Sequence, residues 1–231
     1  LAAMVDASIG GKTAVNLPEA KNLVGAFHQP TAVYADLGTL KTLSKRELAA
    51  GWAEAIKHGL ILDKKLFSLF ETRSEDIKSL LPEISEHIIS RSMEIKARVI
   101  EQDERETTGR RMLLNYGHTI GHGLEAASNY GTLLHGEAVS IGMMGAGMIS
   151  HSMNLLSSSN LDRQRSVLKN FNLPLEYSGV DPEDVLSAIQ LDKKVTSQKV
   201  NWVLLEDIGK TCIRADVPED LVKEIVYSLC N

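Results

Sequence analysis

The chain has few cysteines, and the two that it has are poorly placed for disulfide or metal chemistry. Cys212 and Cys230 are the only cysteines among 231 residues, and they lie far from the histidines without metal-type spacing. Small secreted domains and cysteine-rich metal sites need more cysteines in closer patterns. We therefore expect reduced thiols in a cytosolic, cytoplasmic protein.

The chain also lacks an excess of positive charge and a long apolar run. Lysine and arginine number 25 against 30 acidic residues, for a net charge of -5. This balance disfavours a general nucleic-acid or membrane-surface binder. The longest apolar run, residues 138–149, is interrupted by glycines and is shorter than the ~20 residues that span a bilayer. The run therefore predicts a buried helix. Together with the charge, its length leads us to expect no nucleic-acid or membrane partner.

What is present is ample material for a core. Hydrophobic residues make up 43% of the chain and charged residues 24%, which indicates one large domain or one and a half ordinary ones. The sequence opens at Leu1 with residues typical of the middle of a domain. We therefore expect a fragment of a longer protein.

Three of the seven histidines fall between Asn115 and Glu137. On a helix, His118 and His122 project from one face one turn apart, a spacing that lets two imidazoles meet one metal ion. His135 follows a turn-like segment and can add a ligand when the chain doubles back. Each histidine alone is equally consistent with an ordinary hydrogen-bonded residue, but the cluster, with several glycines beside it, favours a site.

Helical signals dominate the rest of the chain. Ser44 and Glu47 form a capping box before apolar residues at helical spacing. Further helices are predicted at 64–71, 74–81, 83–101, 161–170, 182–190 and 219–229. Residues 1–9 are expected to form the end of a buried strand and residues 31–35 a short strand, with a hairpin at 200–205 and 212–214. The Gly10–Thr13 turn resembles an anion-binding loop but lacks the upstream glycine of a nucleotide P-loop.

One carboxylate completes a possible metal site. Glu54 lies in an apolar helical segment where an unpaired charge is costly, although such residues also occur on solvated faces. A glutamate and two histidines with one open position suit a catalytic zinc or similar ion. Several cations could hold an anionic ligand: Lys12, Lys21, Lys57, Lys96, Arg111, Lys193 and Lys194. The residues thus indicate a metal-dependent enzyme acting on an anionic small molecule.

Seven motifs in a fixed order carry a family resemblance over essentially the whole chain. They are Asp6-Ala-Ser-Ile-Gly-Gly-Lys-Thr13, Gly25-Ala-Phe-His-Gln-Pro30, Ala53-Glu-Ala-Ile-Lys57, Asp103-Glu-Arg-Glu106, Leu114-Asn-Tyr-Gly-His-Thr-Ile-Gly-His122, Leu134-His-Gly-Glu137 and Asp192-Lys-Lys194. The chain closely resembles the 3-dehydroquinate synthase family of the shikimate pathway.

The resemblance implies a mainly α chain: residues 44–231 as the helical metal- and substrate-binding domain, and residues 1–43 as the end of an NAD-binding α/β domain. It implies a homodimer that converts 3-deoxy-D-arabino-heptulosonate 7-phosphate to 3-dehydroquinate and phosphate. In the family, NAD transiently oxidises a ring hydroxyl, phosphate is eliminated, the ketone is reduced and the opened ring closes by an aldol step. The cofactors implied are NAD and Zn²⁺ or Co²⁺, and the partner is a phosphorylated sugar acid.

The resemblance also assigns residues. Glu54, His118 and His135 match the metal ligands, so His122 moves from metal ligand to a substrate-phosphate position. Substrate-contacting positions are matched by Asp6, Lys12, Asn22, Lys57, Lys96, Arg111, Asn115, His122 and one of Lys193 or Lys194. NAD-contacting positions are matched by Lys12, Lys21, Thr39, Leu40, Lys41 and Thr42.

Two departures leave alternatives open. The linker before Arg111 is one residue longer than the common pattern, so Arg110 is an alternative. The glycine-rich NAD turn is missing, so we expect the chain alone to bind metal but not NAD productively. Competing functions are a sister sugar phosphate cyclase, an iron-dependent alcohol or glycerol dehydrogenase, and a non-catalytic metal-binding module.

Overall fold

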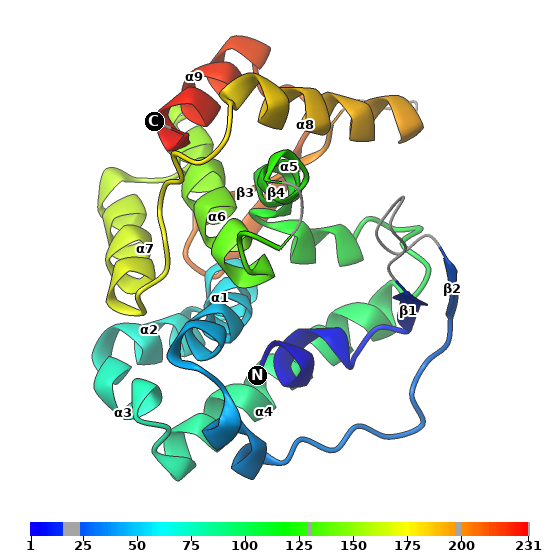
Figure 1. Cartoon of the computed structure of the whole chain (residues 1–231), viewed down its shortest axis with the longest axis vertical. Coiled ribbons are helices and arrows are strands. Elements are labelled where there is room, and N and C mark those ends of the chain that lie inside the picture. The colour runs from blue at the N-terminus through cyan, green and yellow to red at the C-terminus, as the bar shows by residue number, and fades with distance from the viewer. Residues whose placement is uncertain (16–23, 129–130, 197–199, 231) are drawn as a thin grey trace.

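Helices form most of the chain in the computed structural model, which describes residues 1–15, 24–128, 131–196 and 200–230 (Figure 1). The α-helices are α1 (Lys45–Leu62), α2 (Lys64–Thr72), α3 (Ser74–Lys78), α4 (Pro82–Gln102), α5 (His118–Ala127), α6 (His135–Ser152), α7 (Ser158–Asn170), α8 (Pro182–Thr196) and α9 (Glu219–Leu229). The shorter helices are η1 (Ala3–Ala7), η2 (Leu37–Thr42) and η3 (Arg111–Asn115). The predicted mainly α architecture is confirmed.

Helix α1 lies at the centre of the molecule (Figure 1). Its start is the predicted capping box: the Glu47 amide donates to the Ser44 hydroxyl over 3.2 Å, and the Ser44 amide donates to the Glu47 carboxylate over 3.0 Å. Every residue from Ala50 to Ile61 is buried, because α2, α4 and α6 pack around the helix. A charged side chain on this stretch therefore has to find its partners inside the protein.

Helix α6 is the second buried helix, as residues 138–149 predict. It packs against α1, α5, α7 and α9 and against strand β3, and nearly all of its residues from Ala138 to Ser150 are buried. Within the part of the chain that the structure describes, no helix is both long and apolar enough to cross a bilayer.

Two antiparallel strand pairs complete the part of the fold that the structure describes. Strand β1 (Lys12–Val15) pairs with β2 (Val24–Phe27), and β3 (Trp202–Asp207) pairs with β4 (Lys210–Arg214). The β3–β4 hairpin was expected from the sequence, and its β3 side packs into the core against α6.

Three local predictions are wrong. Residues 1–9 hold the short helix η1, which packs on α4 with Val5 fully buried, and not the end of a strand; a short apolar run does not distinguish the two. Residues 31–35 pair with no other strand among the described residues, and Tyr34 is 94% exposed. Helix α8 runs to Thr196, beyond the predicted end at residue 190.

Candidate active site

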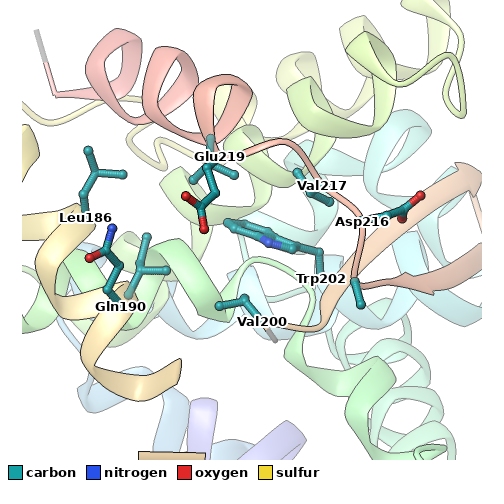
Figure 2. A pocket seen from close by; sticks show the side chains of 10 residues that line it. Leu186, Gln190, Val200, Trp202, Asp216, Val217 and Glu219 are labelled. Carbon is teal, nitrogen blue, oxygen red and sulfur yellow. The ribbon is translucent and has the colours of Figure 1, made fainter. Parts of the chain in front are cut away.

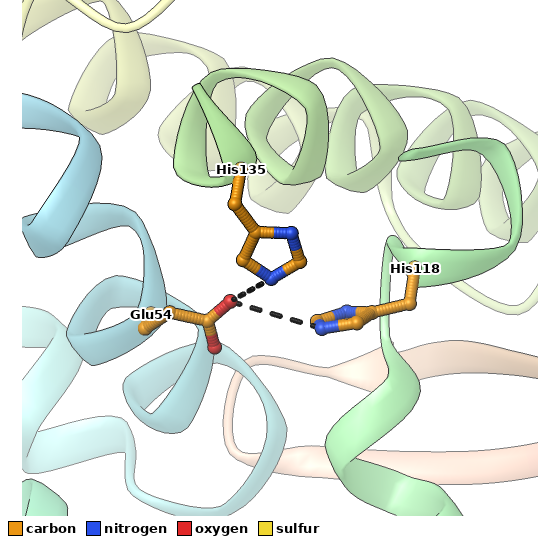
Figure 3. Close-up of side chains that lie close together, drawn as sticks. All are labelled: Glu54, His118 and His135. Atoms are coloured by element: carbon orange, nitrogen blue, oxygen red, sulfur yellow. Dashed lines mark ion pairs between the residues drawn. The ribbon is translucent and has the colours of Figure 1, made fainter. Parts of the chain in front are cut away.

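A buried glutamate, a partly buried histidine and an exposed histidine from three helices meet at one point (Figure 3). The Oε1 atom of Glu54, on α1, lies 3.4 Å from Nε2 of His135 and 3.7 Å from Nε2 of His118. Their potential ligand atoms all lie within 4.8 Å of one another. Two imidazole nitrogens and a carboxylate oxygen at such spacing suit a divalent metal ion with an open position.

Close helix packing delivers both histidines to this point. His118 is the first residue of α5 and follows Gly117, whose φ of +80° is strained for other residues. His135 is the first residue of α6, and a β-carbon on Gly136 would lie 1.9 Å from the carbonyl oxygen of Ala50. The first turn of α6 therefore rests directly on the backbone of α1, which carries Glu54.

A carboxylate that the sequence analysis missed orients His135. The Nδ1 atom of His135 lies 3.3 Å from Oε1 of Glu125, a buried residue of α5. An ionised carboxylate only accepts hydrogen bonds, so Nδ1 donates and Nε2 faces Glu54. The signal was available, because Glu125 is a lone charge in an apolar helical stretch, like Glu54.

An ion pair holds the segment that leads into α6. Arg46 donates through Nε and Nη2 to the Glu137 carboxylate over 2.6 and 2.7 Å, and through Nη2 to the Thr132 carbonyl over 2.8 Å. Glu137 in turn accepts from the Leu134 amide over 2.8 Å. Glu137 belongs to the Leu134–Glu137 motif, but the sequence does not predict that Arg46 is its partner. These contacts fix the backbone beside His135.

The pKa shifts within the cluster are large and differ in direction. Burial acts to raise the pKa of Glu54, but Lys57 and the two histidines hold it well below its usual range. Burial, reinforced by the charge of Lys57, lowers the pKa of His118 to about 3. Partial desolvation also acts to lower the pKa of His135, but the carboxylates of Glu125 and Glu54 raise it to about 9. An ionised Glu54 beside a neutral His118 suits metal ligation.

Two buried lysines flank the cluster. The Lys57 ammonium pairs with Oε2 of Glu54, and the side chains of both are 1% exposed. Lys96, on α4, donates to Oδ1 of Asp6 over 2.7 Å and also to its carbonyl oxygen. Burial lowers the pKa of Lys96. The structure thus places Asp6, Lys57 and Lys96 close to Glu54.

Arg111, and not Arg110, faces the N-terminal segment. Its guanidinium donates to the carbonyl oxygens of Glu104 and Gly10 over 2.8 and 2.9 Å. Its Nε lies 3.2 Å from the Glu106 carboxylate, which also pairs with Lys12. The exposed Arg110 instead donates to Gln102 over 3.1 Å.

His122 and Asn115 lie at exposed positions near the metal-ligand candidates. The ring centroid of His122 is 5.3 Å from that of His118 and 6.2 Å from that of His135. Asn115 ends η3, two residues before the turn into α5. The expected pair of His118 and His122 is therefore close in space, but the group that meets around one point joins His118 to His135 and Glu54.

The remaining predicted residues lie apart from this cluster, or the structure does not describe them. Helix η2 packs on α4 with Leu40 buried, and it contains Thr39, Leu40, Lys41 and Thr42. Lys21 and Asn22 lie outside the described residues. Lys193 and Lys194 fall within α8, but their side chains are outside the described set.

A separate cavity of about 290 Å³ lies between α8, β3 and α9, lined partly by Trp202, Val217 and Glu219 (Figure 2). None of its lining residues belongs to the set that the sequence predicts.

Solved structures define the class of the fold. The 2-epi-5-epi-valiolone synthase ValA from Streptomyces hygroscopicus subsp. jinggangensis 5008, solved with NAD+ and Zn²⁺, matches with a TM-score of 0.90 and 29% identity over 99% of this chain and 63% of its own. A 2-deoxy-scyllo-inosose synthase, solved with carbaglucose-6-phosphate, NAD+ and Co²⁺, matches with a TM-score of 0.83 and 29% identity over 98% of this chain and 64% of its own. The fold is that of the sugar phosphate cyclases.

Sequence comparison identifies the family within that class. Residues 51–195 match the family model described as 3-dehydroquinate synthase C-terminal, and residues 1–50 match the N-terminal model. The 3-dehydroquinate synthase of Methylacidiphilum infernorum (isolate V4) is 45% identical over 98% of this chain and 62% of its own length. That of Prochlorococcus marinus (strain MIT 9211) is 47% identical over 100% and 63%. The chain belongs to the 3-dehydroquinate synthase family and spans less than two thirds of these curated relatives.

Proposed function

We propose that this chain is the metal- and substrate-binding part of a 3-dehydroquinate synthase. The whole enzyme converts 3-deoxy-D-arabino-heptulosonate 7-phosphate to 3-dehydroquinate and phosphate. The observation that carries the proposal is the meeting of Glu54, His118 and His135 beside two buried lysines. Family membership supports the same reaction.

The proposed metal ligands fit a divalent ion for two reasons: their donor atoms are of the right type, and the Glu54 carboxylate lacks hydrogen-bond donors in the part of the chain that the structure describes. Both Glu54 carboxylate oxygens are buried without a hydrogen bond among the described residues, although ion pairs reach them. Glu54, His118 and His135 would hold Zn²⁺ or Co²⁺, the ions in the two solved cyclases. Such an ion polarises a substrate hydroxyl or carbonyl oxygen.

The chain's cations bind and orient the anionic substrate. The phosphate and hydroxyls of the substrate are assigned to Lys57, Asn115 and His122, with Asp6, Lys12, Asn22 and one of Lys193 or Lys194. The substrate carboxylate is assigned to Lys96 together with Arg111. Arg111 offers a planar pair of donors that matches a carboxylate. A phosphate held by cations can itself accept the proton during its elimination, so these residues need mainly to position it.

The remaining assignments concern NAD and assembly. We assign residues 1–43 to the end of an NAD-binding domain and 44–231 to the metal- and substrate-binding domain. Lys12, Lys21 and residues 39–42 contact NAD in the whole protein, which acts as a cytoplasmic homodimer.

The test is phosphate release from 3-deoxy-D-arabino-heptulosonate 7-phosphate with catalytic NAD and zinc. We expect release from a chain restored to the full length of the relatives, and none from this chain alone. Arg111→Ala in the longer chain should raise KM at least tenfold, because the substrate carboxylate loses its paired donors. Absence of release from the longer chain would contradict the proposal.

The second candidate is a sister cyclase, because the two solved neighbours have that activity. Turnover of a sugar phosphate without the carboxylate, and none of the heptulosonate, would establish it. Net accumulation of NADH would instead indicate a dehydrogenase.

A further inference from the structure

His58 is a buried histidine that the proposed reaction does not use. It follows Glu54 by one turn of α1, so the two side chains lie on the same face of the helix. His58 is 0% exposed, and among the described residues neither ring nitrogen has a hydrogen-bond partner. Buried polar groups in proteins are nearly always paired, so this imidazole needs an explanation.

The neighbours of His58 are the two carboxylates of the site. One of its ring nitrogens, a carboxylate oxygen of Asp6 and a carboxylate oxygen of Glu54 lie within 4.8 Å of one another. Each carboxylate is paired with a lysine: Asp6 with Lys96 and Glu54 with Lys57. His58 therefore lies beside two acceptors that ammonium groups already hold.

A second metal ion among Asp6, Glu54 and His58 does not suit this arrangement. The donor types would serve, but the Lys57 and Lys96 ammonium groups already pair with both carboxylates, and they would repel a further cation. An imidazole keeps at least one N–H donor in either protonation state.

An ion at the proposed metal site would weaken the ion pair between the Glu54 carboxylate and the Lys57 ammonium. A divalent ion among Glu54, His118 and His135 shares a carboxylate with Lys57 and repels its ammonium. An oxygen that loses the ammonium in this buried site needs another donor. His58 is a buried N–H donor on the adjacent helical turn.

We propose that His58 is a positioning residue of the metal centre: its imidazole N–H donates a hydrogen bond to the Glu54 carboxylate in the metal-loaded protein. The bond fixes which carboxylate oxygen faces the ion. This inference rests on the proposed metal site and adds to it a residue that does not touch the ion.

The test compares Co²⁺ binding in the parent chain, His58→Phe and His58→Gln. Phenylalanine keeps a planar ring without nitrogens, and glutamine keeps an N–H donor. His87→Phe is the matched control, because His87 is exposed on α4 away from the cluster. Four quantities are measured: the affinity and the stoichiometry of Co²⁺ binding by chelator competition, the visible absorption of bound Co²⁺, and the Tm of the metal-free protein.

We expect His58→Phe to weaken Co²⁺ binding about 10- to 100-fold and to change the Co²⁺ spectrum, as loss of an outer-shell partner does. Its metal-free Tm should not fall, because no hydrogen bond is lost. His58→Gln should restore most of the affinity, and His87→Phe should match the parent.

Four results overturn the inference. The first is parent-like affinity and spectrum in His58→Phe, and the second is His58→Gln binding as weakly as His58→Phe. The third is two Co²⁺ ions per parent chain and one per His58→Phe chain, which would establish the second metal site. The fourth is a parent chain that takes up no Co²⁺, which removes the proposed metal centre itself.

Discussion

His118 and His135 have the same side chain, but their surroundings shift their pKa values in opposite directions. Burial, with the charge of Lys57 added to it, outweighs the opposing charge of Glu54 and lowers the pKa of His118 to about 3. The side chain of His135 is 42% exposed and lies between two carboxylates, and although partial desolvation acts to lower its pKa, these carboxylates raise it to about 9. Desolvation and the nearby charges together thus decide the protonation state of each candidate ligand.

Glu125 gives a prediction at this scale. Glu125→Gln should weaken Zn²⁺ binding about 10- to 100-fold, because Nδ1 of His135 loses the charged acceptor that orients the ring. Competition with a zinc-sensitive dye measures the affinity. Glu224→Gln, at an exposed position on α9, is the control and should bind like the parent. Equal affinities in both variants would show that Glu125 has no part in the site.

At the scale of elements, one carboxylate builds the turn between α4 and η3. Oδ1 of Asp103 accepts from the amides of Thr107 and Thr108 over 2.7 and 3.0 Å, and Oδ2 accepts from the amide of Arg111 over 3.0 Å. These hydrogen bonds lower the pKa of Asp103 to about 2, and those from the amides of Thr108 and Arg111 have the largest effect. The charged motif read as a linker is therefore a structured turn that presents Arg111.

The pH dependence of stability follows from that shift. The pKa of Asp103 is lower in the folded than in the unfolded chain, so the ionised carboxylate stabilises the fold above about pH 4. The contribution is lost as the pH falls from about 4 toward about 2. Asp103→Asn should therefore melt below the parent at pH 7, with a gap in Tm that narrows below pH 4. Thermal melts between pH 3 and 7 measure the gap, and a constant gap would contradict the assignment.

At the scale of the whole molecule, the candidate site joins three helices that are distant in sequence. Glu54, His118 and His135 come from α1, α5 and α6, whose packing forms the middle of the core. A metal ion bound there would connect these helices, and it would bind the folded chain far better than the unfolded one.

Metal removal should therefore lower the stability of the entire chain. At 100 times its Kd, a bound ion adds about 2.7 kcal/mol to the free energy of unfolding, or roughly 5–10 °C in Tm for a chain of this size. Calorimetry with excess Zn²⁺ and with chelator measures the difference. His135→Ala should remove most of it, and a chelator effect that survives in this variant would place the ion elsewhere.

The sequence by itself determined the helical architecture, the start of α1 and the identity of the candidate ligands. Capping boxes and helical periodicity depend on residues that are near one another in the sequence, so Ser44 and Glu47 predict the start of α1. The order of the motifs indicates the family, and the family pattern selects His135 rather than His122 as a metal ligand. A short apolar run has no such local signal, so the sequence of residues 1–9 predicts a strand where the structure has a helix.

Only the tertiary structure decided which distant residues meet. Arg111 and Arg110 are adjacent, and the packing of η3 on the N-terminal segment, not their spacing, directs Arg111 inward. The sequence marks Glu125 as a lone charge in an apolar stretch, but its partner, Nδ1 of His135, comes from α6. The Asp6 carboxylate beside His58 comes from η1. The pattern along a helix shows which face is buried. The partners of a buried charge depend on segments that fold against it from far along the chain.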